Sequence, residues 1–362
     1  VGDVYDGKDY PELWGVFDTF LTGWDQPRNI VCAQLEVPIA IPFPLGEDRW
    51  RIYFRTMDDK PQPLSDVAAR LAVICPDVRL RDPEEAAYFH SHARLARAFR
   101  VGRVFLAGDA AHASNPIEGH GMNAGIQDAF NLGWKLAAIA SGAATEDLAA
   151  SYEVERRPVD ADIVRTGEEA YGRMDPDARD ERAGVYAFLS TPEGRAFAAM
   201  AESEIDFSYA ESPIVEEIGA EIQVPGVMQV GCRVADVDGL VWQGRPVGLS
   251  HLMSGTALIV ILLPGKADGG ADAGATALPA FEAATRTCPM DIELYVVLRS
   301  ENDVAAPAEN ALFDPTGALH ERLAGAGPAV CVIRPDGHLG FRCSPPSPEA
   351  LKVHLEHLFL TA

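Results

Sequence analysis

The segment from Gly102 to Gly142 constrains the fold of this chain more than any other stretch. It opens with the short apolar run from Val104 to Ala107, which is bounded by glycines and predicts a buried strand rather than a helix. Asp109 follows directly after this run. Open α/β sheets bind ligands at the carboxyl ends of their strands, so we expect the Asp109 carboxylate to accept hydrogen bonds from ligand hydroxyls.

A glycine-rich loop and then a helix follow this strand. Apolar residues recur at helical spacing from Ile126 to Ala140, and Gly142 predicts the end of the helix. Gly119 and Gly121 precede it and allow the backbone to approach a ligand closely. The first amides of a helix lack intrahelical partners and lie at the positive end of its dipole, which predicts a site that stabilises negative charge on a ligand.

This ordered set of motifs resembles the FAD-dependent aromatic hydroxylases, the single-component flavoprotein monooxygenases. The second flavin motif of that family is matched by GRVFLAGDAAH at residues 102–112. Its P-x-x-G-x-G-x-N element is matched by residues 116–123, and its GIQDAxNLGWKL by residues 125–136. The alternative is a set of ordinary turn residues between a strand and a helix, and the length and order of the match argue against it.

The resemblance implies how this segment would hold FAD. Asp109 would bind the ribityl chain, and Pro116 would lie beside the reactive edge of the isoalloxazine ring. Backbone amides from Gly121 to Asn123 would stabilise the reduced, anionic flavin. His112 is expected to bond to the local backbone rather than to frame the flavin. The cofactor-binding residues so implied are Gly108, Asp109, Pro116, Gly119, Gly121, Met122 and Asn123.

Residues 1–60 predict an antiparallel sheet. Charged and apolar residues alternate from Arg49 to Arg55, which predicts a strand with one wet face. A Gly-Glu-Asp turn at residues 46–48 joins this strand to the preceding one, which predicts a hairpin. Trp14-Gly15-Val16 and Arg51-Ile52-Tyr53 resemble the phenol hydroxylase branch of the family.

In that branch the Arg and the Tyr lie near the phenol pocket. The resemblance therefore implies Arg51, Tyr53 and Pro116 as the catalytic residues, with Tyr53 bonding to the phenolic oxygen. The alternative is that Tyr53 is a β-former and Arg51 a surface charge. Leu45 stands where the branch has a further pocket arginine, so we expect the substrate contacts to differ from those made to phenol.

The middle of the chain predicts mainly helix. Residues 64–75 and 83–98 indicate helices or mixed structure, and residues 148–172 continue as helix beyond the central motif. His90 and His92 fall two apart with no third ligand in sight, so we expect no metal site there.

From about Val230 the pattern changes to alternating strands and helices. A loop is expected from Gly265 to Gly274, and residues 329–343 predict a hairpin across Pro335-Asp336-Gly337. This order resembles the thioredoxin-like C-terminal domain that many of these hydroxylases carry. None of the six cysteines forms Cys-x-x-Cys, so we expect a scaffold or subunit-contact role, which allows for a homodimer, rather than thiol–disulfide exchange.

The net charge and the cysteines indicate which partners and which cellular compartment to expect. A formal net charge of −24 argues against nucleic acid or an anionic membrane as a partner. The longest apolar stretch, residues 257–264, is too short to span a bilayer. An acidic chain with scattered cysteines is most simply cytoplasmic.

The expected fold is α+β with α/β parts: a p-hydroxybenzoate-hydroxylase-like FAD and substrate domain, followed by a thioredoxin-like domain. We expect a substrate-domain sheet with flanking helices at residues 1–100, the C-terminal part of the FAD-binding domain at 101–225, and the thioredoxin-like domain at 226–362. No Gly-x-Gly-x-x-Gly turn precedes a helix in the right context. We therefore expect that unit upstream in a longer polypeptide, or on a second chain.

The resemblance implies a reaction as well as a fold. NADPH or NADH would reduce FAD, and O2 would add to the flavin to give a hydroperoxide that hydroxylates a small phenolic substrate. Two alternatives stay open. One is a non-catalytic remnant that does not hold FAD alone, and the other is a different flavoprotein reaction on the same fold, such as halogenation or oxidative decarboxylation.

Overall fold

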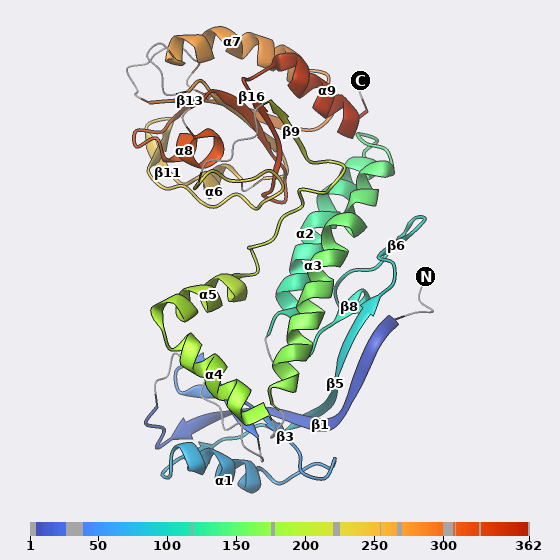
Figure 1. Ribbon diagram of the computed structural model, residues 1–362, viewed down its shortest axis with the longest axis vertical. Helices are drawn as coiled ribbons and strands as arrows, with labels where there is room; N and C mark the ends of the chain where they lie inside the picture. Colours follow the sequence, from blue (N-terminus) through green and yellow to red (C-terminus); the bar gives the residue numbers. More distant parts are fainter. Residues whose placement is uncertain are drawn as a thin grey trace. The chain divides into compact units, whose positions relative to one another are not determined.

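A computed structural model describes residues 5–26, 39–116, 119–174, 178–219, 225–253, 255–265, 270–299, 307, 309–325 and 327–360 (Figure 1). It divides into two compact units. Unit 1 comprises residues 1–98, 106–124 and 160–199, and unit 2 comprises residues 99–105, 125–159 and 200–362. Both units are discontinuous in sequence, and each is described separately below. The three-part domain division expected from the sequence stays a prediction.

Unit 1 is built on a six-stranded sheet in the order β2-β3-β1-β5-β8, with β4 pairing with β1 on the side of this path. Its strands are β1 (Tyr5–Thr22), β2 (Ala40–Gly46), β3 (Arg49–Arg55), β4 (Arg79–Arg81), β5 (Ala87–Ala96) and β8 (His112–Ala113). The pairings of β1 with β3, β4 and β5, of β2 with β3, and of β5 with β8 are all antiparallel. The antiparallel sheet predicted for the N-terminal region is confirmed.

The predicted hairpin between β2 and β3 is also present. Glu47 and Asp48 at its tip have φ of 48° and 63°, the left-handed values that a tight type I′ hairpin turn requires. Successive residues of β3 then point to opposite faces of the sheet. Trp50, Ile52 and Phe54 are buried in one core, whereas Arg51 and Tyr53 lie on the other face.

Each face of this sheet is covered by a helix. The helix α1 (Leu64–Ile74) contributes Val67 and Leu71 to the core that holds Phe54. On the opposite face, the C-terminal part of α3 (Asp147–Gly172) contributes Val164 and Tyr171 to a second core. Tyr53 packs against that second core, so its side chain lies on the α3 side of the sheet.

Two expectations for unit 1 and its neighbouring segment are wrong. Residues 83–98, expected to be helical or mixed in structure, contain no helix and instead hold the strand β5 (Ala87–Ala96), because this strand pairs with β1 over nine positions and the cross-strand contacts outweigh local helical propensity. The run from Val104 to Ala107 gives only a two-residue strand, β7 (Val104–Phe105), which pairs with β6 (Arg100–Val101) in a two-stranded sheet. Val104 is 52% exposed, so this run is not a buried sheet strand in the described part of the chain.

The predicted central helix is confirmed as α2 (Gly121–Ala140). It ends where expected, since Gly142 adopts a left-handed φ of 78°. The amides of Gly142 and Ala143 donate to the carbonyls of Ile139 and Ala138 at 3.0 and 2.8 Å, which satisfies two carbonyls of the last turn. The helices α3, α4 (Arg179–Leu189) and α5 (Pro192–Ser203) follow along the chain.

The described part of unit 2 contains an eight-stranded sheet in the order β11-β10-β14-β13-β12-β15-β16-β9. Its elements are β9 (Glu216–Gly219), β10 (Leu240–Trp242), β11 (Arg245–Val247), α6 (Leu249–Leu252), β12 (Leu258–Leu263), α7 (Gly270–Thr285), β13 (Ile292–Leu298), β14 (Ala311–Phe313), α8 (Ala318–Ala324), β15 (Ala329–Ile333), β16 (Leu339–Ser344) and α9 (Pro348–Leu358). The strands β12 and β13 are parallel, and β15 and β16 form the predicted antiparallel hairpin beside them. The order β13-β12-β15-β16 supports a thioredoxin-like fold, which stays a prediction.

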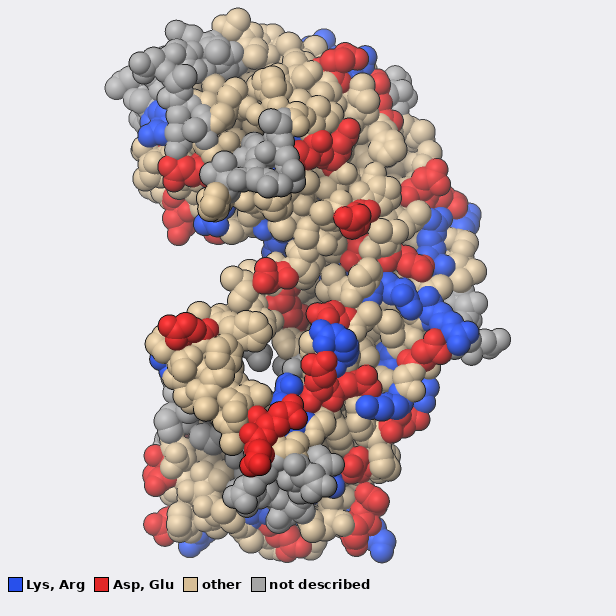
Figure 2. Space-filling model, in the orientation of Figure 1, with Lys and Arg blue, Asp and Glu red and all other residues tan. Residues whose placement is uncertain are grey.

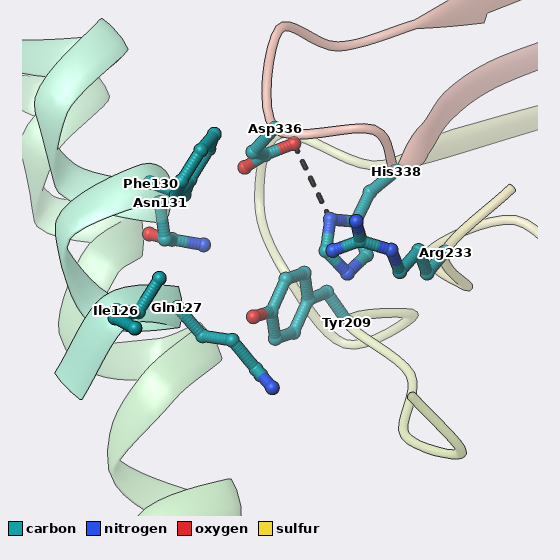
Figure 3. Close-up of a pocket in the computed structure, with 8 residues that line it drawn as sticks. All are labelled: Ile126, Gln127, Phe130, Asn131, Tyr209, Arg233, Asp336 and His338. Atoms are coloured by element: carbon teal, nitrogen blue, oxygen red, sulfur yellow. Dashed lines mark hydrogen bonds and ion pairs between the residues drawn. The ribbon is translucent and has the colours of Figure 1, made fainter. Parts of the chain in front are cut away.

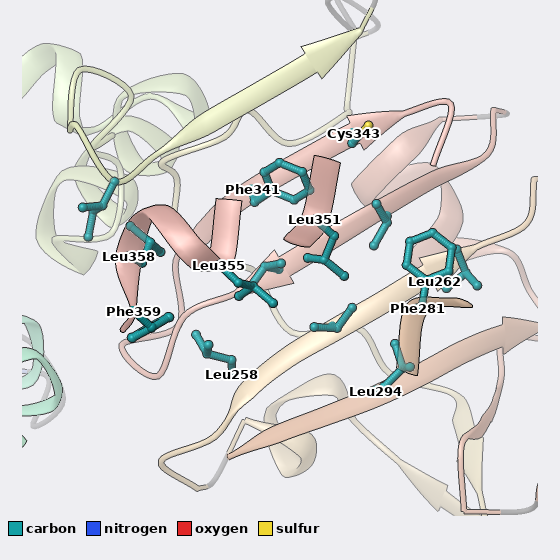
Figure 4. Close-up of a cluster of buried hydrophobic side chains, with 14 of the residues drawn as sticks. Leu258, Leu262, Phe281, Leu294, Phe341, Cys343, Leu351, Leu355, Leu358 and Phe359 are labelled. Carbon is teal, nitrogen blue, oxygen red and sulfur yellow. The ribbon is translucent and has the colours of Figure 1, made fainter. Parts of the chain in front are cut away.

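Apolar cores lie on both faces of this sheet. The helices α7 and α9 cover one face, where Phe281 and Leu355 pack with Leu258 and Leu294 (Figure 4). The other core contains Leu249 of α6 and residues of α8. All six residues of β12 are buried, as expected for a strand covered on both faces. The loop expected from Gly265 to Gly274 is only partly correct, because α7 begins at Gly270 and residues 266–269 lie outside the described residues.

Acidic side chains are spread over the visible surface and interspersed with fewer basic ones (Figure 2). This distribution is consistent with the net charge of −24. In the part of the chain that the structure describes, no helix has the length and apolar character needed to cross a membrane.

Candidate functional site

A cavity of about 510 Å³ in unit 1 brings together most of the site residues predicted from the sequence. Its walls come from β3, β5, β8, the turn before β8, the loop after it and the first turn of α2. The lining residues are Tyr53, Phe89, His90, Ser91, His92, Asp109, Ala113, Ser114, Asn115, Pro116, Gly119, Gly121 and Met122. Of the predicted residues, Tyr53, Asp109, Pro116, Gly119, Gly121 and Met122 therefore share one cavity.

Asp109 lies in a short 3-10 turn, Gly108–Ala110, just before β8. Gly108 does not line the cavity, but its φ of 57° forms the turn that presents Asp109. The backbone carbonyl of Asp109 accepts a hydrogen bond of 2.7 Å from the Tyr5 hydroxyl. Burial, together with the nearby Asp109 charge, raises the pKa of Tyr5 to about 12, so Tyr5 stays a donor. This bond fixes the backbone of Asp109, which is exposed and lines the cavity.

The start of α2 provides a backbone cradle on another side of the cavity. Gly119 has a φ of 77°, and a Cβ built on it would meet no atom within 4 Å, so any side chain there would project into open space. The amide of Ala124 donates to the carbonyl of His120 at 3.0 Å, the first backbone bond of the helix. The amides of residues 121–123 precede it and have no intrahelical acceptor. They lie at the positive end of the helix dipole, where negative charge is stabilised.

Tyr53 forms the aromatic wall of the cavity. Its ring lies edge-on to Phe43 at 5.4 Å and to Phe89 at 6.5 Å between centroids, which holds it in place. Arg51 lies two residues before it on the same face of β3 but does not line the cavity. The Nε of Arg51 donates instead to Asp18 Oδ1 at 2.8 Å. Asp18 chiefly, with Tyr53 adding to the effect, raises the pKa of Arg51.

Two other predicted residues occupy the edge of this site. Asn123 lies exposed in the first turn of α2 and does not line the cavity. His112 is buried in β8, with its Nε2 3.7 Å from Asp160 Oδ2. Neither Asn123 nor His112 lines the cavity, so neither side chain is among those that would touch a ligand there.

The cavity also contains residues that the sequence did not indicate. Phe89, His90, Ser91 and His92 come from β5, in a segment that was expected to form helices or mixed structure. Asp9 carries a hydrogen bond of 2.6 Å to His92 Nδ1. The sequence signal for these positions is weak, because His90, Ser91 and His92 are all polar; the two-residue spacing of His90 and His92, which are both exposed on either side of the buried Ser91, is what fits a strand.

This arrangement suits a flat ligand with polar edges. One wall offers amides that have no acceptor within the helix and the dipole of α2, another a carboxylate, and a third the aromatic side chain of Tyr53 on β3. Pro116 and Met122 add apolar contact between them. Such a mixture of apolar surface and a few convergent polar groups is typical of cofactor and substrate sites.

Known proteins that resemble this chain include an FAD binding domain family and several monooxygenases. The model of the FAD binding domain matches residues 50–167, the segment that contains the whole predicted flavin region. An uncharacterized aromatic compound monooxygenase of Bacillus subtilis (strain 168) is 34% identical over 229 residues, covering 60% of this chain and 44% of that protein. Anhydrotetracycline monooxygenase of Streptomyces rimosus is 37% identical over 201 residues, covering 53% and 40%.

Solved structures share the fold over nearly the whole chain. The anhydrotetracycline hydroxylase from Streptomyces rimosus superposes with a TM-score of 0.70 and 25% identity, covering 99% of this chain and 66% of that chain. A flavin-dependent monooxygenase in complex with FAD and substrate gives 0.70 and 18% identity, covering 98% and 67%. This chain spans less than half the length of these curated relatives.

Proposed function

We propose that this chain, a relative of the FAD-dependent aromatic hydroxylases, forms part of an enzyme that hydroxylates a phenolic aromatic compound with FAD, NADPH or NADH, and O2. The single observation that carries the proposal is the convergence of Tyr53, Asp109, Pro116 and the start of α2 on one cavity of unit 1. These residues are separated by up to 69 positions in sequence, and the motif match alone did not require them to meet.

The residues of the cavity fit FAD on two observations. A Cβ on Gly119 would occupy open space that the present backbone leaves clear, as a ring or chain lying against the backbone requires. The amides of residues 121–123, which have no acceptor within the helix, offer donors to an anionic edge of such a ring. Asp109 would accept hydrogen bonds from ribityl hydroxyls, and Pro116 and Met122 would contact the ring system. When bound, FAD would take electrons from the nicotinamide and activate O2.

This chain's own residues would bind and orient the aromatic substrate. The Tyr53 hydroxyl is the expected partner of a phenolic oxygen, and its fixed ring limits where that oxygen can lie. Arg51 would act on this group from outside the cavity, as a positive charge beside Tyr53 held by Asp18. Apolar contacts from Phe89 and Pro116 would help to exclude water from the reacting ring.

Two other functions stay in competition with this one. The structure of a Diels–Alderase shares the fold with a TM-score of 0.62 and 23% identity, so the fold alone does not decide the reaction. A protein that binds FAD or an aromatic ligand without turnover is the other alternative. The products formed from a phenolic compound distinguish all three.

The experiment is aerobic incubation of the protein with FAD, NADPH or NADH, a panel of hydroxybenzoates and ¹⁸O2, followed by mass spectrometry. The proposal predicts an aromatic product that carries one ¹⁸O atom and forms only with both the nicotinamide and FAD present. Binding of FAD without an ¹⁸O-labelled product would favour the non-catalytic alternative. A product without ¹⁸O would favour another reaction on this fold.

A further inference from the structure

A second, smaller cavity lies within unit 2 and shares no residue with the cavity of unit 1. Its volume is about 120 Å³, and one wall is the exposed face of α2 with Ile126 and Phe130. The facing wall carries Tyr209, Arg233 and His338 (Figure 3). For comparison, an apolar cavity of about 150 Å³ holds benzene. The present cavity is somewhat smaller, but its rim is open, since Phe130 is 65% and Ile126 49% exposed, so one substituted ring can occupy it with part of the ring outside the rim.

His338 provides an unused hydrogen-bonding atom at this cavity. The side chain is 4% exposed, and its buried Nε2 has no hydrogen-bond partner among the described residues. Its Nδ1 lies 3.3 Å from Asp336 Oδ1. The carboxylate of Asp336 also accepts hydrogen bonds from Arg334 and Trp134. Burial alone would raise the pKa of Asp336, but the charge of Arg334 outweighs it and holds that pKa well below its usual range, so the carboxylate is ionised. An ionised carboxylate only accepts, so the imidazole proton belongs on Nδ1.

The bare Nε2 is consequently an acceptor that requires a donor. Burial lowers the pKa of His338, although Asp336 opposes the effect, so the neutral ring with a lone pair on Nε2 is the form present at neutral pH. A buried polar atom without a partner is costly, and one that lines a cavity is satisfied when a ligand donates to it. A ligand anion would be repelled at this atom, whereas a ligand hydroxyl would bind.

Arg233 provides a cation at the same cavity, and its guanidinium requires a hydrogen-bond acceptor. It pairs by backbone with His338, which brings the two side chains to the same wall of the cavity. Its guanidinium has no hydrogen bond or ion pair with any residue that the structure describes, and Arg233 is exposed. A free guanidinium beside a cavity favours a carboxylate through paired, charge-assisted hydrogen bonds.

The aromatic rings around the cavity favour a ligand that itself contains a flat ring. The Tyr209 ring lies 4.4 Å from the His338 ring, which fixes both, and Phe130 faces them from α2 (Figure 3). Gln127 and Asn131 line the cavity too, but their amides already donate to Glu204 and Glu155. The unused groups are thus one acceptor, one cation and aromatic surface.

We propose that this cavity is a second ligand site, which takes a single-ring aromatic acid that bears a hydroxyl group. The hydroxyl donates to His338 Nε2, the carboxylate pairs with Arg233, and the ring lies against Phe130. The site belongs to unit 2 and is independent of Tyr53 and of the cavity in unit 1.

The test uses 3-hydroxybenzoate as the probe and the imidazole resonances of His338 as the readout. Long-range ¹H–¹⁵N spectra of the ¹⁵N-labelled chain report on His338 itself, so binding in unit 1 does not register. The His338 signals are identified by their loss in His338→Gln. The proposal predicts that 3-hydroxybenzoate shifts the Nε2 resonance saturably, and that benzoate, which lacks the hydroxyl, binds at least tenfold more weakly.

Variants at the rim separate the proposal from a merely structural role of His338. Arg233→Met keeps the length of the side chain, removes the cation and is predicted to weaken 3-hydroxybenzoate at least tenfold. The control Arg245→Met changes another exposed arginine of unit 2 and should leave the affinity unchanged, as should Tyr53→Phe. Equal binding of benzoate, an unaltered affinity in Arg233→Met, or a His338 signal that does not respond to the probe would each overturn the proposal.

Discussion

Replacing Glu155 by Gln should destabilise unit 2 strongly. Within the described residues, Glu155 is the only carboxylate that the buried cations Lys135 and Arg334 both contact. Its side chain is fully buried on α3. Arg334 donates to its two oxygens at 2.7 and 2.8 Å, and Lys135 donates at 2.7 Å. The glutamine has nearly the same shape, so the change tests charge rather than packing.

Two routes give a similar magnitude for this loss. Burial alone would raise the pKa of Glu155, but Arg334 and Lys135 outweigh it and lower the pKa from 4.5 to about 2. That difference corresponds to about 3 kcal/mol of stability at neutral pH. Removing one partner of a buried ion pair typically costs about 3–5 kcal/mol. Burial lowers the pKa of Lys135 to about 8, so Arg334 is the stronger partner of the shared carboxylate.

The assay is equilibrium unfolding in urea followed by circular dichroism. Glu155→Gln should lower the free energy of unfolding by about 3 kcal/mol, which moves the midpoint by about 1 M or more. The control is Glu169→Gln on the same helix, whose ion pair with Arg165 is exposed and contributes about 0–1 kcal/mol at most. Because the pKa of Glu155 is depressed, its contribution is present above about pH 4.5 and is lost as the pH falls toward 2. Equal unfolding midpoints for both variants would refute the reasoning.

Three further predictions follow from single side chains. Asp109→Ala should weaken FAD about ten- to hundredfold in a fluorescence titration, since ligand hydroxyls lose a charged acceptor worth about 1.5–3 kcal/mol; an unchanged affinity counts against its role. Tyr53→Phe should slow hydroxylation in single-turnover assays while FAD affinity stays constant, whereas Tyr88→Phe, which faces the other core of the same sheet, should change neither. Burial raises the pKa of Cys331 to about 12, so iodoacetamide at pH 8 should leave it unlabelled in the folded chain, and peptide mass spectrometry that found it labelled would show that this core opens.

The elements set by local chemistry were predictable from the sequence. The helix α2, its end at Gly142 and the hairpin around residues 335–337 all depend on glycine conformation and hydrophobic spacing within a few residues. The side of the cavity that we propose for the cofactor was predictable for the same reason, because Asp109 to Met122 are close in sequence and form one local turn–strand–loop–helix unit.

The parts that the sequence did not predict depend on distant pairing. The strand β5 is defined by its register with β1, some 80 residues earlier, and no local pattern specifies that partner. The ion pair between Glu155 and Arg334 joins residues 179 apart. The sequence predicted a helix over the segment that contains Glu155, and the partner of its carboxylate became visible only with the hairpin of β15 and β16 in unit 2.

The measurement that tests the central claim most directly is hydrogen–deuterium exchange of the chain with and without FAD, analysed peptide by peptide. The account predicts that FAD slows exchange at the amides of residues 121–123, at the start of α2, and in peptides that contain Asp109 and Tyr53, because Gly121, Asp109 and Tyr53 line one cavity. Peptides from β15 and β16 serve as the internal control and should not change. Protection confined to unit 2, or no protection at saturating FAD, would contradict the assignment of this cavity as the flavin site.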